Sequence, residues 1–90
     1  MNTLLISYDL MAPGKDYQRL WSHLESYSNH FKPLESFWLI KTSLSAKDAR
    51  DKIKQFMDLN DRLIVIKVTG AEAAWNNLGD TANQWLKNNL

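Results

Sequence analysis

The chain begins with an apolar run at residues 4 to 6, which continues through Tyr8 to a single carboxylate, Asp9, and then to a Pro13-Gly14 pair. A short apolar run bounded by turn residues is typical of a buried central strand. We therefore predict a strand from residue 3 to Asp9. Residues at the end of such a strand lie in a solvent-reachable loop on a rigid support, so Asp9 is the leading candidate for chemistry.

The apolar period then changes from two to about 3.6 residues in two segments, and each predicts an amphipathic helix. The first predicted helix covers residues 16 to 29, with Asp16 as a candidate cap. The second covers residues 46 to 59 and follows Ser45, which with Asp48 is close to a capping box. The positions on the two apolar faces are Tyr17, Leu20, Trp21, Leu24, Ser28 and Phe31, and then Ala46, Ala49, Ile53, Phe56 and Met57.

Three later segments predict strands and a tail. Pro33 excludes a helix, and residues 34 to 42 favour a short strand, a tight turn near Glu35-Ser36 and a stronger strand over residues 37 to 42. A turn at Asn60-Asp61 precedes the last strand, residues 62 to 68. Residues 71 to 90 predict a helical tail with a break at Gly79-Asp80. Its apolar face consists of Trp75, Leu78, Ala82, Trp85 and Leu86.

The order strand, helix, strand, strand, helix, strand is the split pattern of the α+β ferredoxin-like fold. Right-handed crossovers leave few other ways to join these elements. We predict a single domain over residues 1 to 90. In its core, residues 3 to 68, two helices cover one face of a four-stranded antiparallel sheet, and the helical tail follows at residues 71 to 90. Because Trp75 and Trp85 are large and apolar, we expect the tail to pack on the core and cover a sheet edge.

Alternation along the strands predicts which side chains share a face. It assigns to the helix side Leu4, Ile6, Tyr8, Trp38, Ile40, Ile64 and Ile66. It assigns to the open side Leu5, Ser7, Asp9, Phe37, Leu39, Lys41, Leu63 and Val65. A contiguous apolar patch on a small domain favours a partner surface, and a second copy of the chain is the commonest partner. We therefore predict a homodimer through the open sheet face.

Composition narrows the functional classes. A chain of 90 residues buries only roughly 60 to 65% of its unfolded surface and gains stability from dimerisation. Without cysteine it has no disulfide framework, thiolate nucleophile or cysteine zinc site. The net charge of +1 is too close to zero to indicate nucleic acid by itself. The absence of a long apolar stretch and of a secretory leader predicts a cytoplasmic protein without a membrane partner.

Several short motifs resemble one superfamily. Leu5-Ile6-Ser7-Tyr8-Asp9, Ser36-Phe37-Trp38 and Leu63-Ile64-Val65-Ile66 resemble the small CRISPR-associated Cas-two proteins and the related virulence-associated protein D. The tail, with Ala74-Trp75 and Trp85-Leu86, is similar to a SinR-like bacterial branch of that superfamily. The resemblance implies a ferredoxin-like homodimer whose sheets pack face to face. It also implies that Asp9 matches the catalytic, divalent-metal-binding Asp of the nuclease members.

A catalytic Asp9 would make the protein a metal-dependent endonuclease that acts on RNA or DNA phosphodiesters. Mg²⁺ or Mn²⁺ is the expected cofactor, because such an ion needs only one or two carboxylates and keeps several waters. The ion would polarise the phosphodiester and lower the pKa of a bound water. Ser7 and either Asn60 or Asp61 are candidate outer hydrogen-bond partners. The alternative role of Asp9 is to accept backbone N–H bonds in the loop before the first helix.

A second functional class stays open, a non-enzymatic dimeric domain that binds protein or nucleic acid. This chain has Leu34-Glu35 where the family's nucleases commonly have a Gln, and only Lys15 and Arg19 supply positive charge after the first strand. These two features favour the binding class. The retained Asp9 favours the nuclease.

Other conspicuous residues are predicted to be structural. His23 and His30 are seven positions apart and have no further His or Cys to complete a metal site, so they are expected on the surface. The four tryptophans fall on apolar stripes, which favours core or interface positions over stacking platforms for nucleic acid. The basic residues of the second predicted helix alternate with Asp48 and Asp51, which indicates a solvated face. We expect no cofactor other than the metal ion.

Overall fold

The elements of the structure follow the predicted alternation of strands and helices. The computed structural model describes all residues from Met1 to Leu90. In chain order the elements are β1 (Asn2–Asp9), α1 (Gln18–Glu25), β2 (Asn29–Leu34), β3 (Phe37–Thr42), α2 (Ala46–Ile53), a 3₁₀ turn (Lys54–Phe56), β4 (Arg62–Lys67) and α3 (Asp80–Asn89). No helix has the length and apolar character that crossing a membrane requires.

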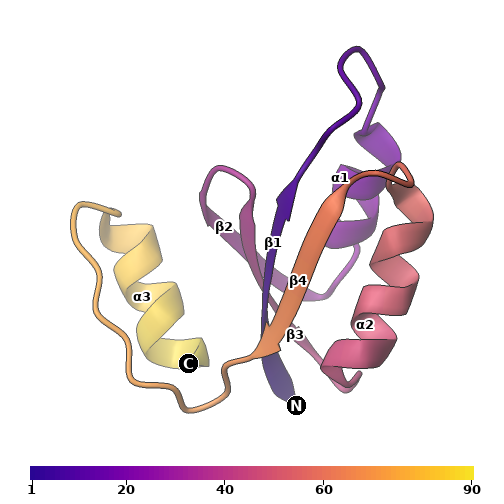
Figure 1. Cartoon of the computed structure of the whole chain (residues 1–90). Coiled ribbons are helices and arrows are strands. Elements are labelled where there is room, and N and C mark those ends of the chain that lie inside the picture. The colour runs from indigo at the N-terminus through magenta and orange to yellow at the C-terminus, as the bar shows by residue number, and fades with distance from the viewer.

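The sheet is organised around β1. This strand pairs antiparallel with β3 on one side and with β4 on the other, and β2 pairs antiparallel with β3, so the strand order is β2-β3-β1-β4 (Figure 1). Leu4 and Ile6 of β1 are fully buried, as expected for a central strand. Pro33 is tolerated because β2 is an edge strand and the β2–β3 register shifts between Phe31 and Leu34. The predicted α+β class with a four-stranded antiparallel sheet is confirmed.

The helices α1 and α2 lie side by side on one face of the sheet (Figure 1). They close a core whose buried members are Leu4, Ile6, Tyr8, Tyr17, Leu20, Leu24, Trp38, Ile40, Ala49 and Ile53. α2 begins at the predicted N-cap, where Ser45 Oγ accepts a hydrogen bond from the Asp48 N–H at 3.1 Å. It ends at Ile53 and continues only as one 3₁₀ turn, so it is shorter than predicted.

The first helix is also shorter than predicted, and β2 begins in its place. The Asp16 carboxylate accepts a bond from the Gln18 N–H at 2.9 Å, a local turn that delays the start of α1. After Glu25 come polar residues that compete with helical hydrogen bonds, and pairing with β3 begins at Asn29. Phe31, which helical spacing assigned to the first helix, therefore belongs to β2.

β4 presents the opposite side chains to those predicted. Leu63 and Val65 pack against the helix-side core, while Ile64 and Ile66 are 53% and 43% exposed on the other face. The register decides this, because Val65 is paired with Ile6 and directly paired residues share a face. Alternation could not fix the phase, since the segment is apolar at every one of these positions. The helix-side assignments on β1 and β3 are confirmed.

The second face of the sheet is covered over its β2–β3 half by α3 (Figure 1). Leu39, Ala82 and Leu86 are buried between them. Residues 71 to 79 are not helical, and Gly70, Asn77 and Gly79 adopt positive φ angles of 72°, 61° and 89°, which a right-handed helix does not contain. The predicted helix over residues 71 to 90 is thus wrong for its first half. The tail covers a sheet face, not an edge.

Polar contacts fix the last turn of α3 to the start of β1. The Thr3 hydroxyl donates to the Asn89 carbonyl at 2.7 Å and satisfies one of the carbonyls that a helix end leaves unpaired. Asn29 Nδ2 donates to Asn89 Oδ1 at 2.7 Å. Trp85 Nε1 donates to Asn29 Oδ1 at 2.8 Å, and the Trp85 ring stacks on Phe31 with centroids 5.4 Å apart. α3 is therefore an integral layer of the domain.

The apolar patch predicted for a partner is divided by this arrangement. Leu5 and Phe37 pack against the cluster under α3, where Leu39 is buried. Leu63 and Val65 of β4, the other two members of the predicted patch, face the helices. On the β4 half of this face, the apolar side chains that remain exposed are Ile64 and Ile66.

Candidate functional site

Asp9 ends β1 on the sheet face that also carries α3. In the β1–β4 register, Asp9 is opposite Arg62, and two residues earlier Ser7 is opposite Ile64. Because directly paired and alternate residues share a face, these four side chains project together. A hollow of about 200 Å³ lies here, lined by Ser7, Tyr8, Asp9, Arg62, Leu63 and Ile64.

The Asp9 carboxylate is exposed and has no hydrogen bond or ion pair within the chain. The alternative role predicted for it, accepting backbone N–H bonds in the following loop, is therefore absent from the structure. Asp61 performs that role. Asp9 thus keeps all of its oxygen lone pairs available to a ligand from outside the chain.

Asp61 ties together the two loops at this end of the sheet. Its Oδ1 accepts from the Met11 N–H at 2.6 Å and from the Tyr17 hydroxyl at 2.9 Å, and its Oδ2 accepts from the Asp58 N–H at 2.7 Å. Burial acts to raise the pKa of Asp61, but these three hydrogen bonds favour the carboxylate more strongly and leave that pKa below its usual value. Asp61 is consequently committed to structure, and it is not an outer partner of Asp9.

Arg62 is the functional candidate that the sequence interpretation missed. It is exposed, lines the same hollow as Asp9 and makes no ion pair with it. An unpaired guanidinium is suited to a phosphate, which it binds through two parallel N–H bonds. The signal for Arg62 lay in the pairing of β4 with β1, which places two residues 53 positions apart directly opposite each other.

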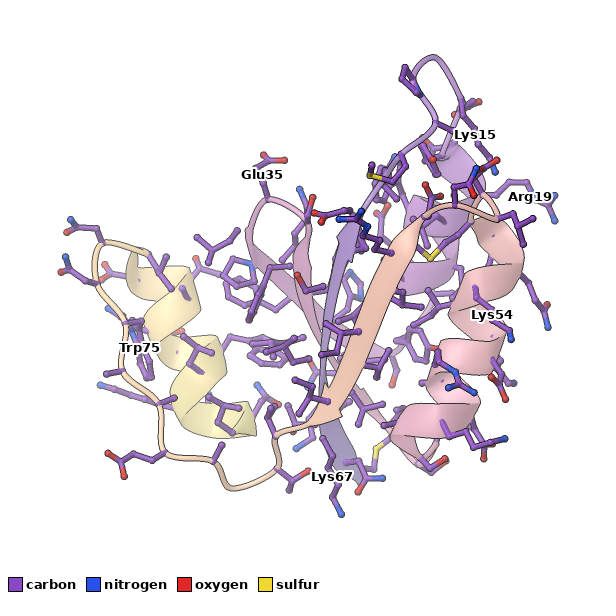
Figure 2. All side chains as sticks on the ribbon, in the orientation of Figure 1. Lys15, Arg19, Glu35, Lys54, Lys67 and Trp75 are labelled. Atoms are coloured by element: carbon purple, nitrogen blue, oxygen red, sulfur yellow. The ribbon has the colours of Figure 1, made fainter.

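The remaining basic side chains lie elsewhere. Figure 2 shows Arg19 and Lys54 on the helix layer, on the other side of the sheet from Trp75, and Lys67 at the far end of β4. Lys47, Arg50 and Lys54 all lie within 4.0 Å of Asp51, at 3.4, 2.9 and 3.9 Å. The hydrogen bond from Arg50 lowers the pKa of Asp51, and Lys47 adds to the effect. The predicted solvated charged face on α2 is confirmed.

The two histidines contact aromatic residues instead of forming a metal site. His23 stacks on Phe56 with ring centroids 4.8 Å apart, and its Nε2 lies 3.1 Å from the Tyr27 hydroxyl. Burial lowers the pKa of His23, and the charge of Lys52 lowers it further. His23 is half-buried and not fully on the surface as predicted, because it packs on Phe56, whereas His30 is exposed as predicted.

The hollow contains one oxygen ligand that suits a hard divalent cation, the Asp9 carboxylate. No three His, Asp or Glu side chains converge anywhere in the chain, so one copy offers the Asp9 carboxylate alone. Mg²⁺ is commonly held by one or two carboxylates and completes its shell with water and substrate phosphate. A free carboxylate beside a free guanidinium can thus hold a cation and a phosphate at the same place.

No family model matches the sequence, and no solved structure matches the chain.

Proposed function

We propose that the chain has a ferredoxin-like fold and acts as a homodimeric, divalent-metal-dependent endonuclease on RNA or DNA phosphodiesters. The strand order β2-β3-β1-β4, with α1 and α2 together on one face, supports this fold. The motifs that resemble Cas-two proteins and virulence-associated protein D support the activity. Fold alone would not, because one fold hosts many functions.

The observation that carries the proposal is the condition of Asp9. A carboxylate at the end of a central strand is usually engaged in the adjoining loop, yet this one has no partner and faces a hollow with Arg62. The neighbouring loop is held by Asp61 instead. Asp9 is therefore exposed on a rigid support without serving the fold.

Each side chain of the hollow has a distinct role in this proposal. Asp9 holds the metal ion, and Ser7 donates a hydrogen bond near it. Arg62 binds a non-bridging phosphate oxygen and orients the phosphodiester against the hollow. A bound Mg²⁺ or Mn²⁺ supplies Lewis acidity and a water of lowered pKa.

A second Asp9 would come from the partner subunit of a homodimer. Ile64 and Ile66 are the exposed apolar side chains on the β4 half of the sheet face, and Ile64 lines the same hollow as Asp9. A two-fold axis through this surface would bring both copies of Asp9 toward one another. One metal ion could then be shared by the two chains.

The Asp9→Asn variant tests the proposal, because the amide keeps the size of the side chain and removes the charge that a divalent ion requires. We expect the unmodified protein to cleave single-stranded RNA or duplex DNA with Mg²⁺ or Mn²⁺ and the variant to lose about a hundredfold or more in rate. Mn²⁺ binding measured by calorimetry should weaken in the same variant. Asp80→Asn, an exposed acid at the start of α3, is the matched control.

Two outcomes decide against the proposal. Equal cleavage by the unmodified protein and Asp9→Asn would exclude Asp9 as the catalyst. Absence of both cleavage and Mn²⁺ binding in the unmodified protein would exclude the nuclease and leave the second class, a non-enzymatic domain that binds protein or nucleic acid.

A further inference from the structure

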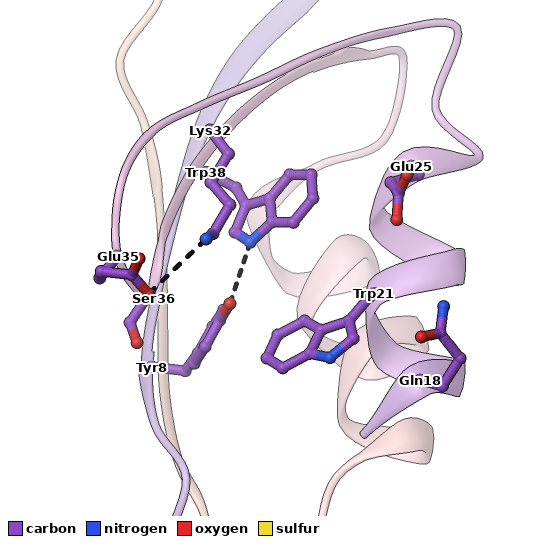
Figure 3. Close-up of a pocket in the computed structure, with 8 residues that line it drawn as sticks. All are labelled: Tyr8, Gln18, Trp21, Glu25, Lys32, Glu35, Ser36 and Trp38. Atoms are coloured by element: carbon purple, nitrogen blue, oxygen red, sulfur yellow. Dashed lines mark hydrogen bonds and ion pairs between the residues drawn. The ribbon is translucent and has the colours of Figure 1, made fainter. Parts of the chain in front are cut away.

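A larger hollow lies on the helix side of the sheet, away from Asp9 and Arg62. It has a volume of about 420 Å³, within the range of small-molecule sites. The eight residues that line it are Tyr8, Gln18, Trp21, Glu25, Lys32, Glu35, Ser36 and Trp38. Figure 3 shows that α1 supplies one wall and the β2–β3 hairpin the other, with the aromatic rings between them.

All three apolar residues that line this hollow are aromatic. The Tyr8 and Trp21 rings lie 5.6 Å apart at an angle of 39°, and Trp38 Nε1 donates to the Tyr8 hydroxyl at 2.9 Å. These contacts fix Tyr8 and Trp38, which are 4% and 5% exposed, while Trp21 is half-buried. Aromatic faces of this kind attract cations, with Trp the strongest.

The charges around the rings have the same preference. The hollow contains two carboxylates, Glu25 and Glu35, and one ammonium, Lys32. Lys32 is already paired with Glu35, with Nζ and Oε2 3.7 Å apart, so Glu25 has no ionic partner. Burial raises the pKa of Tyr8, the hydrogen bond from Trp38 offsets part of that rise, and the negative charge of Glu35 adds to it. A phosphate or carboxylate group would meet net negative charge here.

The Tyr8 hydroxyl adds a directional requirement. It accepts the Trp38 hydrogen bond, but its own O–H hydrogen has no acceptor in the chain. A buried hydroxyl that lines a hollow is most stable when a ligand or water accepts that hydrogen. A ligand that fits should therefore carry a neutral oxygen acceptor as well as a positive charge.

We propose that this hollow is a binding site for a small organic cation, an alkylammonium group on a short chain with a hydroxyl or carbonyl oxygen. The ammonium group lies over Trp21 beside Glu25, and the oxygen accepts from Tyr8. The site is independent of the proposed nuclease activity, because it involves the opposite face of the sheet and none of the residues around Asp9 except Tyr8.

Choline is the probe, and 3,3-dimethylbutan-1-ol, its uncharged counterpart of the same shape, is the control ligand. We expect choline to change tryptophan fluorescence saturably and to shift the NMR signals of the Trp21 indole and of Gln18. The uncharged alcohol should bind about tenfold more weakly or not at all. Equal binding of the two ligands would overturn the proposal, as would binding of adenosine in preference to choline.

Variants separate the contribution of the Trp21 ring to choline binding from that of the Glu25 charge. The unmodified protein should bind choline most tightly, Trp21→Phe more weakly and Trp21→Leu most weakly, with a total loss of about tenfold in affinity. Glu25→Gln, at an exposed position that leaves the core intact, should weaken choline and leave the uncharged alcohol unchanged. Glu72→Gln, an exposed acid of the segment before α3, is the matched control. Unchanged choline affinity in Glu25→Gln would overturn the proposal even if the Trp21 variants failed to fold.

Discussion

Asp61 and Asp9 lie at the same end of the sheet and differ in what their carboxylates do. Asp61 accepts three hydrogen bonds, two from backbone N–H groups and one from Tyr17, and so joins the loop after β1 to the turn before β4. Asp9 accepts none and is exposed in the hollow with Arg62. An unused carboxylate is the one that a ligand can recruit, which is why the proposed chemistry rests on Asp9.

Asp61→Ala should destabilise the fold by about 1 to 2 kcal/mol at pH 7, because three donors lose their acceptor at a partly exposed site. The folded-state pKa of Asp61 is lowered, so its stabilising effect is present above about pH 4 and is lost as the pH falls through that pKa. The difference in unfolding free energy between Asp61→Ala and the unmodified protein should therefore shrink between pH 7 and pH 3. Chemical denaturation at both pH values measures it, with Glu72→Gln as the control. A difference that is constant across this range would contradict the assignment.

At the scale of elements, α3 behaves as a third layer that covers half of a sheet face. It buries Leu39 with Ala82 and Leu86, and its last turn is bound to β1 through the Thr3 hydroxyl. The segment before it is not helical, because Gly70, Asn77 and Gly79 adopt positive φ angles that interrupt a helix. The tail therefore contacts the core mainly through α3, and Trp75 and Leu78 of the preceding segment pack against the same cluster.

Two tryptophans of the tail form a matched pair that tests how much α3 stabilises the core. Trp85 stacks on Phe31 and donates to Asn29, both in β2, whereas Trp75 Nε1 donates to Asn83 within the tail at 2.6 Å. We expect Trp85→Ala to cost about 2 to 4 kcal/mol and Trp75→Ala clearly less. Urea denaturation measures both.

Deletion of residues 71 to 90 should leave an aggregating or unfolded product, and a truncated chain as stable as the full one would refute the role of α3.

At the scale of the whole molecule, β4 is a strand whose outer face α3 does not cover. It is an edge strand, and its outer face carries Ile64 and Ile66, which are 53% and 43% exposed. A free strand edge beside apolar side chains favours association. Because α3 already covers Leu39, a dimer should use the β4 half of this face.

Sedimentation velocity at micromolar concentration should therefore show a dimer. Ile66→Asp should weaken association by about 2 kcal/mol, roughly thirtyfold in Kd, because a charge would be desolvated in the interface. Leu59→Asp is the matched control, since Leu59 is an apolar residue that is 98% exposed in a turn away from this face. A monomeric unmodified protein, or equal effects of the two variants, would rule out this interface.

The local pattern of the sequence determined the order of strands and helices up to β4 and the α+β class of the fold, but not the lengths of the helices. The apolar run at β1, Pro33 and the Ser45 cap act within a few residues of themselves, so their consequences are readable from spacing alone. For the same reason the position of Asp9 at a strand end was predictable. The absence of hydrogen-bond partners for Asp9 was not predictable, because it depends on the position of Asp61, which binds the loop instead.

Tertiary structure alone decided which faces of the elements are buried and which are exposed. The phase of β4 depends on its register with β1, since a strand that is apolar on both sides has no phase of its own. The register also placed Arg62 opposite Asp9. The apolar stripe of the tail indicated burial but not its partner, because hydrophobic attraction has no direction. Only packing showed that α3 covers the chain's own sheet and leaves Ile64 and Ile66 exposed.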